Sequence, residues 1–208
     1  EPAAIVINRT AFEGLPIPQS RQELIEALRA RPEVFRNRVG TYDVRQSGLG
    51  YLLATQDARA SETFWRLMEV MGSLDVQLYC CSGDMIDHIE DGTIAVAYNV
   101  LGSYAAARAQ SNETLEIVLP ADFPTTMMRT AMVSKQTAQP AAAQAFIQHL
   151  INQQTGTSDI AILLPPLNPK GANIERATIA LEPALMTFLD ALKRRQFLAE
   201  WENAVIQE

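Results

Sequence analysis

Short apolar runs alternate along the chain with stretches in which apolar residues recur every three or four positions. Short apolar runs between turn-forming residues are typical of buried strands, whereas the wider spacing is typical of helices that bury one face. The apolar runs predict six strands, at residues 4–7, 39–42, 76–79, 94–98, 115–119 and 127–133.

The stretches between these runs predict helices. One helix follows Ser20, which is placed to cap it together with Glu23, and Pro32 stops it. Further helices are expected from Ser47-Gly48 onward, around residues 64–71, after Ser82-Gly83-Asp84, and at 103–109, 140–151 and 183–205. Strands that alternate with helices predict an α/β fold with a largely parallel sheet flanked by helices, followed by a C-terminal helical segment.

Composition and charge narrow the class of protein. The chain has 208 residues, of which 48% are hydrophobic and 20% charged, as in ordinary globular proteins. Its formal net charge of −7 lacks the basic character of a nucleic-acid binder, so we expect no nucleic-acid partner. No apolar run reaches the roughly 18 residues that suggest a membrane-spanning helix. The start at Glu1 shows no signal-peptide pattern, so we expect a mature or trimmed product from which a signal peptide has been removed.

The two cysteines are neighbours, Cys80 and Cys81. Their Cα atoms must lie about 3.8 Å apart, closer than the roughly 4.4 Å minimum usual for a disulfide. We therefore expect both to be reduced and buried at a strand end. The histidines His88 and His149 stand apart from them, so no metal site and no cofactor are predicted.

Three predicted strands end in a similar way, with a serine or asparagine and a glycine before the next helix. These ends are Ser47-Gly48, Ser82-Gly83 and the stretch from Asn99 to Gly102. In an open α/β sheet, ligands bind beyond the carboxyl ends of the strands, and unpaired N–H groups at helix starts favour anions. Taken singly, each motif is also explained as an ordinary helix cap. Together, the three predict a site for a small polar or anionic ligand.

Motifs for catalysis are absent: the sequence contains no GxSxG, no P-loop and no GxGxxG pattern, so we expect no enzyme. The carboxylates between Asp84 and Asp91 are typical of a solvated helix face. Arg129 lies in the apolar run 127–133 and would need a partner there, which is either a structural carboxylate or a ligand.

The order of these motifs resembles the extracellular solute-binding proteins of ABC transporters, in the branch usually labelled iron(III)-type. The resemblance covers essentially the whole chain. The matching segments are Gly40-Thr41-Tyr42-Asp43, Ser47-Gly48-Leu49-Gly50-Tyr51, Ser82-Gly83-Asp84-Met85, Asp91-Gly92, Ala97-Tyr98-Asn99-Val100-Leu101-Gly102-Ser103-Tyr104, Pro120-Ala121-Asp122 and Leu189-Asp190-Ala191-Leu192-Lys193-Arg194.

The resemblance implies a periplasmic-binding-protein-like fold of two lobes joined by crossover strands, with the ligand between the lobes. Residues 1–9 would hold a hinge strand, 10–122 the second ligand-binding lobe, and 123–208 a crossover strand and a segment that returns to the first lobe. The family's opening segment, which builds most of the first lobe, has no counterpart here. We therefore expect a partial protein whose uncovered apolar surface favours self-association.

The resemblance also suggests which residues hold the ligand. Iron-binding members place two adjacent tyrosines after the strand that here ends at Asn99, whereas this chain has the separated Tyr98 and Tyr104. Binding of a polar or anionic solute is therefore carried over, and ferric ion is left aside. The candidate ligand-binding residues are Ser47, Gly48, Ser82, Asn99, Tyr98, Tyr104 and Arg129.

Two functions follow from this resemblance. The first is a periplasmic solute-binding protein that captures a small polar or anionic solute and passes it to ABC permease subunits. The second is the extracytoplasmic ligand-sensing domain of a membrane sensor kinase, which a membrane-spanning helix after Glu208 would indicate. In both, closure of two lobes around the solute is the expected mechanism.

Overall fold

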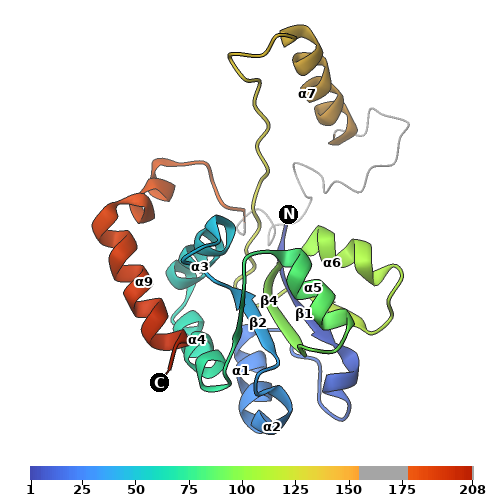
Figure 1. Ribbon diagram of the computed structural model, residues 1–208, viewed down its shortest axis with the longest axis vertical. Helices are drawn as coiled ribbons and strands as arrows, with labels where there is room; N and C mark the ends of the chain where they lie inside the picture. Colours follow the sequence, from blue (N-terminus) through green and yellow to red (C-terminus); the bar gives the residue numbers. More distant parts are fainter. Residues whose placement is uncertain (155–177, 208) are drawn as a thin grey trace.

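A five-stranded sheet forms the centre of the computed structural model, which describes residues 1–154 and 178–207 (Figure 1). The strand order is β3-β2-β4-β1-β5. Strand β2 runs parallel to β3 and β4, while β1 runs antiparallel to its neighbours β4 and β5. Four of the five strands therefore share one direction, as the alternation of strands and helices predicts. The strands are β1 (Ala3–Asn8), β2 (Val39–Tyr42), β3 (Gln77–Tyr79), β4 (Val96–Leu101) and β5 (Leu115–Val118).

Helices cover both faces of this sheet. One core joins α1, α3, α4 and α9 to the sheet, and the other joins α5 and α6 to the opposite face. Figure 1 shows these two groups on the two sides of the strands. The helices are α1 (Arg21–Ala30), α2 (Pro32–Phe35), α3 (Gly48–Ala60), α4 (Thr63–Ser73), α5 (Ser82–Glu90), α6 (Gly102–Ala109), α7 (Pro140–Gln154) and α9 (Ala191–Val205), with the 3-10 helices η1 (Arg9–Phe12) and η2 (Pro183–Leu189).

The strand β1 shows how alternation divides the two cores. Ile5 and Ile7 belong to the core under α1, α3, α4 and α9, whereas Val6 belongs to the core under α5 and α6. All three side chains are fully buried. Successive side chains of a strand point to opposite faces, so a continuous apolar run is what a strand covered on both sides requires.

The predicted cap of α1 is confirmed. The Ser20 hydroxyl accepts a hydrogen bond from the Glu23 N–H at 3.1 Å. The Glu23 carboxylate accepts from the Gln19 N–H at 2.8 Å, one residue earlier than in a standard capping box. Pairs of local hydrogen bonds such as these satisfy helix-start N–H groups that have no partner within the helix.

The predicted strand at residues 127–133 does not form. Thr126 makes isolated bridges to Pro2 and Thr178, and the Met127 N–H donates to the Glu1 carbonyl at 2.9 Å, but residues 128–133 are exposed and belong to no described strand. An apolar run becomes a strand only where another strand offers hydrogen-bond partners. The prediction of a buried strand there was wrong.

The predicted continuous helix at residues 183–205 is also divided. It consists of η2 and α9, separated at Asp190, whose backbone is extended with φ −57° and ψ 133°. The Asp190 carboxylate accepts hydrogen bonds from the N–H groups of Leu192 and Lys193 at 3.0 and 3.1 Å. An aspartate that caps a helix start stabilises a break in the backbone between the preceding turn and the new helix. The pattern of apolar residues continues through this break, so that pattern alone predicts one helix where the structure has η2 and α9.

Among the described helices, none combines the length and apolar character that crossing a membrane would require.

Helix α7 lies apart from the sheet at the end of an extended stretch (Figure 1).

Candidate functional site

The carboxyl ends of three neighbouring strands meet at one edge of the sheet. Strands β2, β3 and β4 are adjacent and parallel, and α3, α5 and α6 follow them directly in the sequence. The starts of these three helices therefore lie together at one end of the sheet, which we call the strand-end edge. In Figure 1 the start of the chain lies between α3 and α6, beside the strand-end edge.

Two of the three helix starts at this edge keep unpaired N–H groups. At α3, the Ser47 hydroxyl caps the Gly50 N–H at 3.1 Å, and no described residue accepts from the N–H of Gly48. At α5, none accepts from the N–H of Gly83. A Cβ atom added at either glycine would meet nothing within 4 Å. Both helix starts therefore combine donors, a favourable dipole and open space, as anion binding requires.

The third helix start, that of α6, is already occupied by a carboxylate. Glu1 accepts hydrogen bonds from the Ser103 N–H at 2.8 Å and from the Ser103 hydroxyl at 2.6 Å. Arg129 donates to the same carboxylate at 3.1 Å, and its guanidinium lies 5.4 Å from the centre of the Tyr104 ring. Arg129 is half exposed rather than buried in a strand. Its partner is therefore a structural carboxylate, one of the two kinds of partner that the sequence predicted for Arg129. The position of the same carboxylate on Ser103 shows that the start of α6 attracts negative charge.

The Ser82 hydroxyl joins three elements at the strand-end edge. It lies 2.5 Å from the Tyr42 hydroxyl at the end of β2, and it accepts from the Leu101 N–H at 3.1 Å. Ser82 is the first residue of α5 rather than its cap, and it is buried. Burial raises the pKa of Tyr42 to about 12, so its phenol stays protonated and able to donate.

A buried polar network uses the side chains of Tyr98 and Asn99. Asp57, in α3, accepts from the Tyr98 hydroxyl at 2.6 Å and from the Asn99 amide at 2.8 Å. Asn99 has a positive φ of 64°, a conformation that asparagine tolerates better than most residues and that lies here within β4. The turn expected from Asn99 onward is therefore a continuation of the strand to Leu101.

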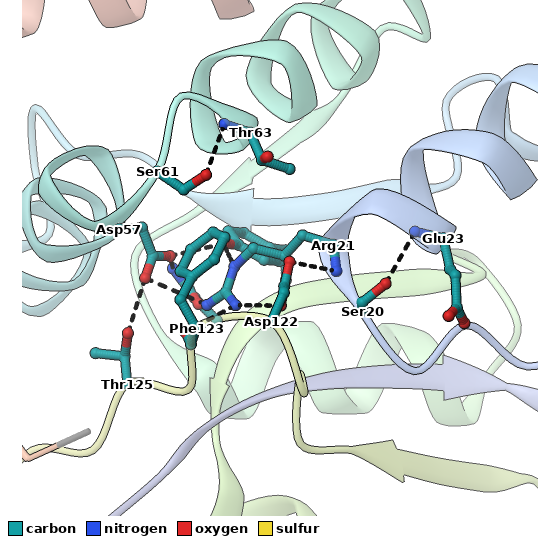
Figure 2. A network of polar contacts seen from close by, with 11 residues as sticks. Ser20, Arg21, Glu23, Asp57, Ser61, Thr63, Asp122, Phe123 and Thr125 are labelled. Atoms are coloured by element: carbon teal, nitrogen blue, oxygen red, sulfur yellow. Dashed lines mark hydrogen bonds and ion pairs between the residues drawn. The ribbon is translucent and has the colours of Figure 1, made fainter. Parts of the chain in front are cut away.

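Arg21 completes this network, and Figure 2 shows its guanidinium between Asp57, Asp122 and Phe123. It donates to Asp57 at 3.2 Å, to Asp122 at 3.1 Å and to the Phe123 carbonyl at 3.0 Å, and it lies 3.7 Å from the centre of the Phe123 ring. Thr125 donates to Asp57 at 2.9 Å. The network thus fastens residues 122–125 to α1 and α3.

The charges within this network compensate one another. Burial alone would lower the pKa of Arg21, but its anionic and phenolic neighbours raise it above its ordinary value. Burial raises the pKa of Tyr98 well above its ordinary value. The arginine is thus charged and the phenol neutral, which suits a structural network in which the Tyr98 hydroxyl accepts from Arg21 at 2.5 Å and donates to Asp57.

Sequence reasoning missed Arg21 and Asp57. Asp57 comes three residues after the buried Ala54 on α3, so it shares the face that packs inward. A carboxylate on such a face signals a buried cation, because an unpaired charge there would be strongly destabilising. The position of Asp57 could therefore have predicted a buried cation, but the sequence does not show which arginine pairs with it.

The cysteines differ from their prediction as well. Cys80 and Cys81 are reduced, as expected, but both are exposed rather than buried. They follow the short strand β3, which is the outermost strand of the described sheet, so no further described strand pairs with β3 on its open side. The Cys80 thiol lies 3.6 Å from the Asp84 carboxylate. A hydrogen bond with Cys81 raises the pKa of Cys80 to about 11.

The predicted site residues thus fall into two groups. Tyr98 and Asn99 are committed to the buried network around Asp57. The others lie at or beside the strand-end edge and are Ser47, Gly48, Ser82, Tyr104 and Arg129.

Sheet topology and helix starts define an α/β lobe of the kind that binds small solutes at the carboxyl ends of its strands. The model of a family described as bacterial extracellular solute-binding protein matches residues 1–173. The chain belongs to this family, whose members bind solutes outside the cytoplasm rather than catalyse reactions. The expected family and fold class are confirmed.

Solved structures agree with this assignment. The substrate binding protein of an ABC transporter from Agrobacterium tumefaciens is 27% identical, with a TM-score of 0.85, over 99% of this chain and 64% of that one. This chain therefore spans just under two thirds of that relative's length. No curated protein sequence matches the chain significantly.

More distant structures share the fold. AfuA from Actinobacillus pleuropneumoniae, solved with fructose-6-phosphate, is 14% identical with a TM-score of 0.67 over 100% of this chain and 67% of that one. Iron-bound HitA from Pseudomonas aeruginosa is 14% identical with a TM-score of 0.55 over 98% and 66%.

Proposed function

We propose that the protein is the solute-binding component of an ABC transport system, which captures a small polar or anionic solute and delivers it to permease subunits from the periplasm. The observation that carries this proposal is the meeting of three helix starts at the strand-end edge, two of them with open N–H groups. The membership of the family and the 27% identical ABC-transporter protein support the transport role.

The solute would be held mainly by backbone donors. The open N–H groups at Gly48 and Gly83 offer hydrogen bonds from two sides, and each helix dipole adds about 0.3–1 kcal/mol at an exposed site. Tyr104 and Arg129 are exposed beside α6 and would add an aromatic surface and a cation. Because the Glu1 carboxylate already occupies Ser103 at the start of α6, an acidic group of a solute would bind most easily at the open starts of α3 and α5.

A polar or anionic organic solute fits this edge better than ferric ion. Of the two tyrosines, Tyr98 is buried between Arg21 and Asp57, which leaves only Tyr104 of this pair exposed. The related structures were solved with solutes as different as fructose-6-phosphate and iron. The fold therefore leaves the choice of solute to the residues at the edge.

Residues 1–9 and 123–133 would be the two crossover segments to another lobe. The Ala3 N–H donates to the Thr125 carbonyl at 2.8 Å, and the Met127 N–H donates to the Glu1 carbonyl at 2.9 Å. Two segments that leave the lobe side by side would make a hinge about which closure over the solute is possible.

A charge placed at Gly48 tests the solute site without disturbing the fold. After a thermal-shift screen of inorganic phosphate, sulfate and sugar phosphates, calorimetry would compare Gly48→Asp with Gly48→Ala. The aspartate enters open space and suits a helix start, so stability should be kept. It should weaken anion binding about tenfold or more, because like charges about 4 Å apart repel by roughly 1–4 kcal/mol.

A second pair of variants separates Arg129 from arginines elsewhere. Arg129→Gln should weaken anion binding about tenfold or more, because hydrogen bonds to charged groups contribute roughly 1.5–3 kcal/mol. Arg108→Gln is the matched control, since Arg108 is an exposed arginine that pairs with Asp87 and Glu90 on α5. Equal affinities in Gly48→Asp, Arg129→Gln and the unmodified protein would show that the solute does not bind at this edge.

A further inference from the structure

Three side chains with metal-binding atoms converge where β3 ends and α5 begins. Cys80 and Cys81 follow the last strand residue, Tyr79, and Asp84 lies in the first turn of the helix. The two Sγ atoms and a carboxylate oxygen of Asp84 all lie within 4.8 Å of one another. All three residues are exposed.

The chemistry of this cluster favours a soft cation over other uses. A disulfide between the adjacent residues Cys80 and Cys81 would be strained, because their Cα atoms are closer than disulfides usually allow. Two sulfur atoms and one oxygen are ligands that zinc and cadmium accept, whereas magnesium and calcium prefer oxygen alone.

The spacing of the ligand atoms also fits. Zinc–sulfur bonds of about 2.3 Å place two ligands of a tetrahedral site roughly 3.5–4 Å apart. The Cys80 sulfur already lies 3.6 Å from the Asp84 oxygen, so small side-chain rotations would bring all three atoms onto one ion.

We propose that Cys80, Cys81 and Asp84 bind one thiophilic divalent cation, of the zinc and cadmium class, with a fourth position open to water. The two thiols release their protons to solvent on binding, and no oxidant or reductant takes part. Two thiolates and one carboxylate give the occupied site a net charge of −1, next to the open N–H of Gly83. This site uses side chains that the proposed solute site does not need, so neither proposal depends on the other.

Cadmium binding to the reduced, full chain tests the proposal. Absorption in the near ultraviolet reports cadmium–thiolate bonds, and competition with a chromophoric chelator gives the affinity. The chain has only two cysteines, so the absorption has a single origin. The variants are Cys80→Ser, Cys81→Ser and Asp84→Asn. Asp87→Asn is the matched control because Asp87 is an exposed carboxylate of the same helix that pairs with Arg108.

We expect one cadmium ion per chain. Each cysteine variant should lose more than the roughly 10–100-fold in affinity that removal of an outer-shell partner costs, and Asp84→Asn should lose about tenfold or more. Asp87→Asn should bind as the unmodified chain does, and circular dichroism should show every variant folded. Two ions per chain, unchanged binding in Asp84→Asn, or equal binding in a Cys80→Ser, Cys81→Ser double variant would each overturn the three-ligand site.

Discussion

Two regions of this protein contain similar apolar residues, but one region buries them and the other leaves them exposed to solvent. In the lobe, which we define as residues 3–122, the phenylalanines at 12, 35 and 64 are buried, with Phe64 at 1% exposure. In the described part of residues 127–192, Met132 is 85%, Leu181 70% and Phe146 62% exposed. An apolar pattern therefore specifies a helix such as α7, but burial also needs an opposing surface.

Helix α9 shows the other outcome beyond the lobe. It packs on α4, and its residues Phe197, Trp201, Ala204 and Val205 are buried in the core of the lobe. Its partner is close enough that Gly72 of α4 has no room for a side chain, since an added Cβ would lie 2.3 Å from the Ala204 carbonyl oxygen. What separates α9 from α7 is a partner surface rather than apolar content.

The largest effect is expected where the lobe holds its buried charge. Asp57→Asn should lower the free energy of unfolding by about 3–5 kcal/mol, because it removes the fully buried anion of Arg21 and leaves only the partly exposed Asp122 to balance the guanidinium. Urea unfolding would measure the change. Asp87→Asn, which breaks an exposed ion pair with Arg108, should cost at most about 1 kcal/mol. Similar losses in the two variants would contradict the structural role assigned to the network.

A smaller effect is expected from close packing behind the strand-end edge. Gly50→Ala should lower the free energy of unfolding by about 1–3 kcal/mol, because the added Cβ would lie 2.3 Å from the Tyr42 Cβ atom. Gly83→Ala is the control, since a Cβ there meets nothing within 4 Å. Thermal and urea unfolding should show the control unchanged or slightly stabilised, and a destabilised control would argue against this packing.

The smallest effect on stability is expected in the exposed region. Phe146→Ser should change the free energy of unfolding by no more than about 0.5 kcal/mol, while Phe64→Ser in the lobe should cost more than about 3 kcal/mol. Large exposed apolar patches tend to find partners, so the unmodified chain should self-associate in light scattering and Phe146→Ser should reduce this. A strictly monomeric unmodified chain would contradict the expected self-association.

Much of the lobe could be read from the sequence, and the reasons are local. Short apolar runs gave the five strands, and Ser20 and Ser47 mark helix starts because a hydroxyl satisfies N–H groups within three residues. Two elements outside the lobe were predicted wrongly, the run at 127–133 and the joined helix around Asp190, because the outcome depended on a distant partner or on a competing local cap. Within the lobe, the two cysteines predicted to be buried are exposed.

The sequence predicted the location of the candidate site better than it predicted which side chains are free to bind there. Parallel neighbouring strands bring their carboxyl ends together, so the three strand ends had to meet if the sheet formed as expected. Which side chains remain free there was not predictable, because Tyr98 and Asn99 were taken up by Asp57, which is 41 and 42 residues away in the sequence.

By itself, the sequence determined the class of fold, the family and the positions of most helix starts, because these follow from periodicity, local caps and motif order. Only the tertiary structure decided that Arg21 pairs with Asp57, that Glu1 occupies the start of α6, and that the two thiols face solvent beside Asp84. Each of these contacts depends on which surfaces meet when the chain packs. A charged or apolar group has several possible partners in the sequence, and the folded arrangement decides which of them it contacts.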